Sequence, residues 1–536
     1  MRRKFVVAGG VGLVAAVVVG MAQFKNSHAS QKVLQTMMMS EPVTMNPVLT
    51  TDIYSGQAQD QVYESFYRYN GDKIVPAMAE QVVKPSENDT VYTFKIRPNA
   101  RWSNGDHVIA QDFITAIQKM ADPKTKSQAS ADSDSVMKNY DAVHKGTLSP
   151  DQIGAKALDQ HTVEITLAQP VPWFNQLATT ILPVDTKKYQ LWGDKYGTAS
   201  NYMVTNSAYQ MIGWTGTNTS FTFEKNPYYW HADQVHIDKV KTRVIKTPMT
   251  AAGEFKNQHL DIAQLSDNYI ANYRKQSNYH AVPQAIVRGL YFNETASKTN
   301  NQNLRQAFGY LINRDEITQS VMKDGSVPQS NAVPQGVMKN AATGKDFTEN
   351  AGVQFSMNKQ KAKEAWAAYL KETGQHAVNL SMTFDNDPTS KSVGEYIQYT
   401  AEHTLPGLTI NTKYEPHNQV VSDVLKQNFD LVNIGLSVNI ADASFPLKIG
   451  QTGYGLNFSK VSDPTYDQLL TQANDSVTDP ARRYQLLQEA NKYFTHTKAY
   501  MVPLYQPITA NVVAKRVGGF QANAFHTANY QDMYWQ

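Results

Sequence analysis

Residues 91–113, VYTFKIRPNARWSNGDHVIAQDF, constrain the fold most, because the spacing of apolar side chains changes within this short stretch. Tyr92, Phe94 and Ile96 alternate with polar residues, which predicts a strand with one buried face. Residues 103–106 (SNGD) then favour a tight turn, since asparagine and glycine tolerate positive φ.

A helix is predicted directly after this turn. Its apolar residues recur at intervals of three and four, and Asp122-Pro123 predicts its end. The residues on the apolar face are Ala110, Phe113, Ile114, Ile117 and Met120.

The same two periods recur along the chain. Strands are predicted at 33–39, 163–167, 221–223, 378–384, 408–410 and 429–434. Helices are predicted at 170–182, 304–312, 358–370 and 479–495, the third capped by Asn358 with Gly374 beyond its end. Strands that alternate with helices indicate an α/β protein.

Composition narrows the class of protein. The 536 residues are 18% charged and 41% hydrophobic, as in globular chains, and the net charge of +3 gives no reason to expect nucleic acid as a partner. The chain has no cysteine, which excludes disulfides, thiolate catalysis and cysteine-based metal sites.

Motifs for catalysis and metal binding are incomplete. His231 and His236 are five residues apart, the wrong spacing for shared ligation on a helix. Gly344-Lys345 is followed by Asp346, so it is not a phosphate-binding loop. Residues 435–439 (GLSVN) lack the final glycine of a nucleophile elbow. We therefore expect no enzyme, no metal and no cofactor.

The N-terminus has the features of an export signal. Residues 2–4 (RRK) are basic, and residues 5–22 are apolar apart from glycines. Cleavage after 27–29 (SHA) or 20–22 (GMA) would leave an exported protein, so residues 1–30 are either a signal peptide or a retained membrane anchor. A diacylglyceryl anchor of the kind attached to an N-terminal cysteine is excluded because no cysteine is present.

Several blocks resemble the extracellular solute-binding proteins of family 5, the peptide-binding components of ABC importers. The resemblance starts in the opening stretch, at Arg97, residues 102–105 (WSNG) and residues 110–113 (AQDF). Further blocks are 62–69 (VYESFYRY), 74–80 (IVPAMAE), 224–230 (EKNPYYW) and 303–317 (NLRQAFGYLINRDEI). A dozen such blocks follow the family's order through the mature chain.

The resemblance implies a two-lobed fold like that of periplasmic binding proteins (type II, cluster C-like) with an extra inserted domain. Lobe I would be discontinuous, comprising residues 31–63, 187–285 and 507–536. Domain II would be inserted at 64–186, and lobe III would span 286–506.

The family resemblance also points to a ligand site in DLVNIGLSVNIADASFP, residues 430–446. In relatives this segment pairs with a bound peptide through main-chain hydrogen bonds, so Gly435, Leu436 and Ser437 would line the site. Gly435 would also allow another chain to approach closely. The alternative is an ordinary core strand.

Two departures from the family pattern concern charge. Asn439 stands where peptide binders have an aspartate for the ligand's α-ammonium group, and Asn433 stands where they have an arginine. An amide lacks the charge-assisted strength of a carboxylate, and Asp442, three residues on, is the candidate substitute. Tyr505 and Ile53 are weaker candidates for pocket walls.

The implied function is that of a monomeric, exported substrate-binding component of an ABC importer. It would bind a peptide between two closing lobes and deliver it to a membrane permease. The alternatives are a cell-surface scaffold, adhesion or peptide-sensing protein with the same fold, and an importer component for a non-peptide ligand.

Overall fold

The computed structural model describes residues 32–536, except for 72, 128–134, 354 and 526–527. The strands and helices of the described residues belong to one compact unit, Val33–Gln536. The expected signal peptide or anchor at 1–30 lies outside the described residues. Within the described part of the chain, no helix is long and apolar enough to cross a bilayer.

Two sheets are built from segments that are far apart in the sequence. The first has the order β1 (Leu34–Met38), β9 (Lys239–Val244), β8 (Ser220–Lys225) and β7 (Tyr209–Ile212), with β1 parallel to β9. The second joins β10 (Ile262–Leu265), β18 (Ile508–Val513) and β11 (Tyr279–Pro283), all antiparallel. β19 (Val517–Gly518) and β20 (Tyr534–Trp535) pair near the C-terminus.

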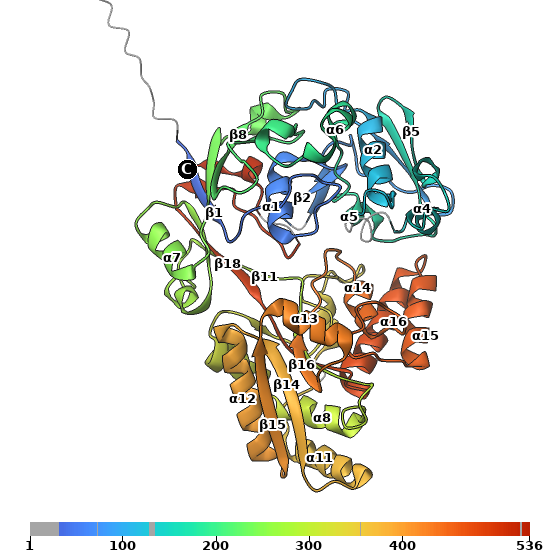
Figure 1. Ribbon diagram of the computed structural model, residues 1–536, viewed down its shortest axis with the longest axis vertical. Helices are drawn as coiled ribbons and strands as arrows, with labels where there is room; N and C mark the ends of the chain where they lie inside the picture. The colour runs from blue at the N-terminus through green and yellow to red at the C-terminus, as the bar shows by residue number, and fades with distance from the viewer. Residues whose placement is uncertain (1–31, 72, 128–134, 354, 526–527) are drawn as a thin grey trace, which may run out of the picture. The chain divides into compact units, whose positions relative to one another are not determined.

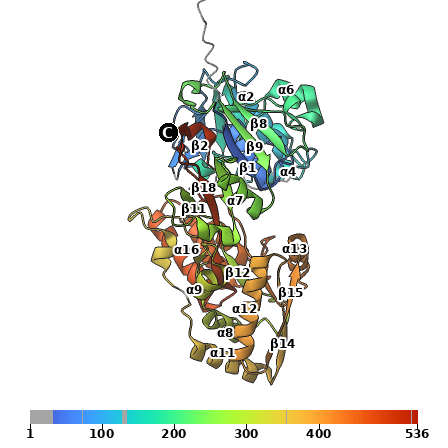
Figure 2. The ribbon, with the colours of Figure 1, turned by 90° about the vertical axis from the view of Figure 1, so that its left-hand side faces the viewer.

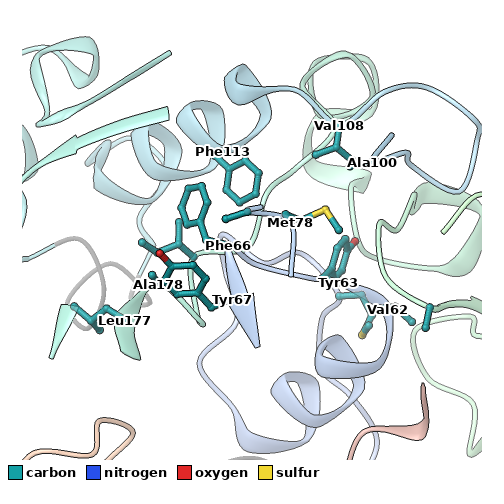
Figure 3. Packing of buried hydrophobic residues seen from close by; sticks show 14 of the residues in the cluster. Val62, Tyr63, Phe66, Tyr67, Met78, Ala100, Val108, Phe113, Leu177 and Ala178 are labelled. Atoms are coloured by element: carbon teal, nitrogen blue, oxygen red, sulfur yellow. The ribbon is translucent and has the colours of Figure 1, made fainter. Parts of the chain in front are cut away.

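The opening strand, turn and helix of the sequence are confirmed. β4 (Val91–Lys95) pairs with β6 (Thr162–Thr166), which also pairs with β5 (Ala155–Asp159), and α2 (Ala110–Ala121) buries the predicted apolar face. Phe66 stacks between Phe94 and Phe113, with ring centroids 4.1 and 4.2 Å apart. Figure 3 shows Phe66 and Phe113 side by side in this core. The hairpin β2 (Tyr67–Asn70) and β3 (Lys73–Pro76) adjoins it.

The largest sheet has six strands. Their order is β13 (Val327–Pro328), β17 (Met501–Gln506), β12 (Arg288–Phe292), β16 (Leu431–Ile434), β14 (Val378–Asp385) and β15 (Leu408–Glu415). One face is covered by α8 (Gln302–Leu311), α11 (Lys359–Thr373) and α12 (Pro388–Thr404) (Figure 2). The other is covered by α13 (His417–Lys426), α15 (Pro464–Asp475) and α16 (Pro480–Lys492) (Figure 1).

Capping residues fix two of these helices, α11 as predicted. Asn358 accepts a hydrogen bond from the Lys361 N–H at the start of α11, and Gly374 ends the helix with φ of +68°. Asp479 caps α16, with Pro480 as its first residue. The shorter helices are α1 (Ile53–Val62), α4 (Tyr140–His144), α5 (Phe174–Leu177), α6 (Thr186–Trp192), α7 (Pro248–Lys256), α9 (Arg314–Glu316), α10 (Phe347–Ala351) and α14 (Ser444–Leu447).

The helix predicted at 170–182 is wrong in length, because only α5 forms there. The Ser65 hydroxyl lies 2.7 Å from the carbonyl oxygens of both Ala178 and Ile181 and can donate its one proton to either, which ties this stretch to the segment around Ser65. The carbonyls after α5 therefore serve contacts with another segment in place of a further helical turn.

The sheets fall into three groups along the chain. The first group comprises β1, β7–β11 and β18–β20. The second comprises β2–β6, between residues 67 and 166. The third is the six-stranded sheet, whose strands lie between residues 288 and 506. The division into lobe I, domain II and lobe III stays a prediction.

Candidate ligand-binding site

The predicted binding segment continues directly from β16. Within β16, Gly289 of β12 lies opposite Ile434, and β14 pairs with the other edge at Leu431 and Val432. Pairing with the β12 chain continues beyond the strand: Ile286 bridges to Ser437, and the Val438 N–H donates to the Ala285 carbonyl at 2.9 Å. The register is the same throughout, so residues 435–438 extend β16 on one side.

The other side of residues 435–437 is an open strand edge. β14 ends at Asp385, and no described residue makes a main-chain hydrogen bond to this edge. Hydrogen-bonded and non-hydrogen-bonded pairs alternate along an antiparallel ladder. Because the next pair, Val438 and Ala285, is hydrogen-bonded, Ile286 and Ser437 form a pair that does not exchange hydrogen bonds. By strand alternation, the N–H and C=O groups of Gly435 and Ser437 therefore point away from the β12 chain. An edge of this kind accepts an additional strand.

Gly435 is required by the close approach of its neighbour in the sheet. A Cβ at this position would lie 2.5 Å from the Val287 carbonyl oxygen, which is backbone and cannot move aside cheaply. The close approach expected at this glycine is thus made by a segment of the same chain, and it leaves the opposite edge open.

The neighbouring candidates lie on different sides of this segment. Leu436 packs partly buried on the core beneath α13, α15 and α16, whereas Ser437 and Asn439 are exposed. Asn433 is buried, with Nδ2 donating to the Gly289 carbonyl at 3.3 Å and Oδ1 without a hydrogen-bond partner in the described residues.

Asp442 is held inside the protein. Arg483 binds its two carboxylate oxygens at 2.7 and 2.8 Å, and both side chains are almost fully buried. The hydroxyl and N–H of Ser444 donate to the same carboxylate. Both carboxylate oxygens of Asp442 are thus engaged by protein groups, so this residue holds the loop after residue 439 in place. Removing one partner of such a buried pair is strongly destabilising.

The two weaker candidates differ in exposure. Tyr505 on β17 is only 4% exposed and lines a pocket of about 230 Å³. Burial raises its pKa to about 12, so the phenol is neutral at physiological pH. Ile53, the first residue of α1, is 67% exposed, and Asp52 caps the helix by accepting from the Ser55 N–H at 2.8 Å.

Contacts between the predicted domain II and lobe III were missed by the sequence analysis. The Gln176 amide donates to the Ala441 carbonyl at 3.2 Å and accepts from the Ala441 N–H at 2.8 Å. The rings of Trp173 and Phe445 meet edge to face, 4.7 Å apart. The one signal for these contacts in the sequence is the presence of aromatic residues next to α5 and in the binding segment.

The side chains around the segment offer hydrogen bonds and packing. Within the part of the chain that the structure describes, no three histidine or carboxylate side chains gather in a way that could hold a metal ion. The open edge of residues 435–437 presents main-chain donors and acceptors.

Comparison with known proteins identifies the family. A family model described as "Bacterial extracellular solute-binding proteins, family 5 Middle" matches residues 73–458, well over half of the chain. The chain belongs to this family. The family 5 proteins are a class of solute-binding proteins and are not defined by any catalytic activity.

Curated relatives of this family 5 protein match over nearly their whole length. A dipeptide-binding protein of Lactococcus lactis is 30% identical over 513 residues, which cover 92% of this chain and 90% of the relative. The oligopeptide-binding protein OppA of Bacillus subtilis is 27% identical, with 88% and 87% covered.

Solved structures confirm the predicted fold class. Listeria monocytogenes OppA bound to peptide superposes with a TM-score of 0.77 at 27% identity, covering 95% of this chain and all of the other. The substrate-binding domain of an oligopeptide ABC transporter from Bacillus anthracis gives 0.79 at 29% identity, with 95% and 99% covered. The family 5 protein thus has the two-lobed periplasmic-binding-protein-like fold.

Proposed function

We propose that this family 5 protein is the substrate-binding component of an ABC importer and binds peptides in an extended conformation. The observation that carries the proposal is the open edge of residues 435–437, whose outward N–H and C=O groups have no partner in the described residues. The names of the relatives, which are dipeptide- and oligopeptide-binding proteins, support the same ligand class.

Main-chain pairing would make binding tolerant of ligand sequence. Gly435 and Ser437 offer two donors and two acceptors, each worth about 0.5–1.5 kcal/mol net, or about 2–6 kcal/mol in all. Micromolar affinity requires about 8 kcal/mol. The remainder would come from burial of ligand side chains, with Tyr505, Ile53 and Leu436 as wall residues and Asn433 and Asp442 as supports of the segment.

Ligand capture would involve closure of the two lobes. The Gln176–Ala441 and Trp173–Phe445 contacts join the predicted domain II to lobe III and would form in the closed state. A membrane permease would then receive the ligand from an exported, monomeric binding protein. The leader at 1–30 would direct export and, if retained, anchor the protein at the membrane.

The neutral Asn439 bears on the length and termini of the ligand. Its amide can accept a hydrogen bond from an α-ammonium group without the added strength of a charge pair. Peptides that are long, or held mainly by their interior residues, would therefore bind as well as those with a free amino terminus close to residue 439.

Native mass spectrometry of the protein purified without denaturation tests this function. Acid release followed by sequencing should yield peptides of mixed sequence. A single non-peptide ligand would overturn the peptide assignment. A protein that carries no ligand, and whose melting temperature does not change with a peptide library in thermal-shift assays, would contradict import and favour a scaffold or adhesion role.

A further inference from the structure

A pocket of about 230 Å³ lies at the end of the six-stranded sheet, and its lining includes Ile286 and Arg288 of the chain that pairs with the binding segment. It is lined by residues from the β12 chain, from the loop after Met322, from the start of α12 and from β17. The lining side chains that carry the argument are Ile286, Arg288, Met322, Asp324, Asp387 and Tyr505.

Strand geometry shows which face of the sheet the pocket shares with residues 435 and 437. Residues directly opposite each other in an antiparallel pair project their side chains to the same face. Ile286 lies opposite Ser437, and the same register sets Arg288 opposite Gly435. A strand added along 435–437 would therefore direct alternate side chains toward the face on which the pocket opens.

The charge of the pocket is negative. The Arg288 guanidinium is neutralised by Asp385 at 2.8 Å, and the other oxygen of Asp385 contacts His417 Nδ1 at 2.9 Å. Asp324 and Asp387 have no such partner among the described residues.

Each of these two carboxylates has an uncommitted oxygen. Asp324 Oδ1 accepts from the Ser326 N–H at 2.9 Å, and Asp387 Oδ1 caps α12 by accepting from the Ser390 N–H at 3.0 Å. No described residue donates to the Oδ2 atom of either carboxylate.

Tyr505 provides an independent sign that the pocket receives a polar group. Tyr505 is only 4% exposed, yet its hydroxyl makes no hydrogen bond with any described residue. The hydroxyl is not sealed off by protein atoms either, so it faces the pocket that the residue lines. The hydroxyl is therefore a polar group without a protein partner that a ligand entering the pocket can satisfy.

The walls suit the stem of a long side chain. Most of the exposed lining is polar, and the half-buried Ile286 together with the edge of the buried Met322 supplies a small apolar part. Lysine and arginine pack their methylene stems on such surface while the charged end reaches acceptors. A terminal α-ammonium group lies on the axis of a strand, whereas the pocket lies to the side where side chains project.

We propose that this pocket binds a lysine or arginine side chain of the bound peptide, with Asp324, Asp387 and the Tyr505 hydroxyl as its acceptors. This specificity rests on the proposed peptide-binding function. It makes the family 5 protein an importer component that prefers peptides with a cationic residue at one defined position.

Isothermal titration calorimetry with alanine-based pentapeptides tests the preference. One lysine is placed at each position in turn, and matched peptides carry norleucine, which keeps the stem and removes the charge. At one position lysine should bind about tenfold more tightly than norleucine, as expected for a charge-assisted contact. N-acetylated versions should keep this preference.

The double variant Asp324→Asn, Asp387→Asn tests the two acceptors. Asparagine caps helices as well as aspartate does, so α12 should keep its start. The lysine preference should fall below about threefold while norleucine peptides bind as before, which also shows that the variant is folded. Asp479→Asn is the matched control, because Asp479 also caps a helix that begins with proline but does not line the pocket.

Three results would overturn the specificity and leave peptide binding intact. Lysine and norleucine could bind equally at every position, the preference could vanish on N-acetylation, or it could survive in the double variant. If no pentapeptide binds at all, both this inference and the proposed function fail.

Discussion

Two adjoining stretches of one strand, residues 431–434 and 435–438, differ in what lies along their edges. The first is buried, pairs with β12 on one side and meets β14 on the other. The second keeps the β12 partner in the same register, but β14 has ended, and Ser437 is exposed. Under the proposed function, the sheet becomes a binding surface where one neighbouring strand stops and the other continues.

The comparison also separates the roles of side chain and backbone. In 431–434 the side chains fill the cores on both faces of the sheet, as Leu431 and Val432 do on opposite sides. In 435–437 the main chain carries the proposed function. Substitutions in the first stretch should change stability, and substitutions in the second should change binding.

Leu431→Ala should have the largest effect, because Leu431 is fully buried. The free energy of unfolding should fall by about 3–5 kcal/mol through lost burial and the cavity left behind. Urea denaturation measures this loss, and Leu436→Ala, which truncates a half-buried leucine, is the control with a smaller cost. Peptide affinity of the folded Leu431→Ala protein should stay nearly unchanged; a large loss of affinity would mean that the two stretches are not separable.

Ser437→Pro should weaken peptide binding by about 10–100-fold, because it removes an outward N–H and disturbs the edge. The N–H of residue 437 is not used in pairing with the β12 chain, so the fold should survive. Ser437→Ala removes only the hydroxyl and should alter affinity by less than about threefold. Calorimetry with the same pentapeptide compares the two, and equal effects of both substitutions would argue against main-chain recognition.

Asn439→Asp should raise affinity for peptides with a free amino terminus by about tenfold, since a carboxylate adds charge to the hydrogen bond. N-acetylated peptides are the control and should show no gain. Competition binding with matched free and acetylated peptides measures the difference. A gain for both kinds of peptide would place the effect elsewhere than at the ligand's terminus.

The smallest expected effect is a change in the free energy of unfolding with pH, caused by His496. Burial, with Lys492 and Lys361 nearby, lowers the pKa of His496, which packs against Phe355 with ring centroids 4.6 Å apart. The unfolded chain therefore takes up a proton more readily, and stability is lost as the pH falls below about 6.5.

The variant His496→Gln should abolish this contribution. Its unfolding free energy relative to the wild type should improve by less than about 1 kcal/mol between neutral and acidic pH. Urea denaturation of both proteins at the two pH values gives the difference. Peptide affinity of the variant should match that of the wild type, and a difference in stability that stays constant with pH would refute the assignment.

The sequence predicted elements whose apolar residues show one clear period. The strand and helix at 91–121 and the capped helix α11 are cases in which each side chain's place follows from spacing. The helix predicted at 170–182 was wrong because Ser65, more than 100 residues earlier, takes the carbonyls that a longer helix would use.

The site was accessible from sequence only in part. Family resemblance pointed to residues 435–437, but β16 is buried on both faces, so its spacing does not tell which side each residue takes. The engagement of Asp442 by Arg483 and the grouping of Asp324, Asp387 and Tyr505 bring together residues that are distant in the chain. Such contacts leave no periodic signal.

The most direct measurement is hydrogen exchange of the Gly435 and Ser437 amides, followed in protein labelled with ¹⁵N at glycine or serine, with and without saturating pentapeptide. Strand addition predicts that both amides exchange at least about tenfold more slowly when the peptide is bound. The Gly289 amide in the β12 ladder serves as the internal reference and should not change. Unchanged exchange at residues 435 and 437 in the saturated protein would contradict main-chain pairing at this edge.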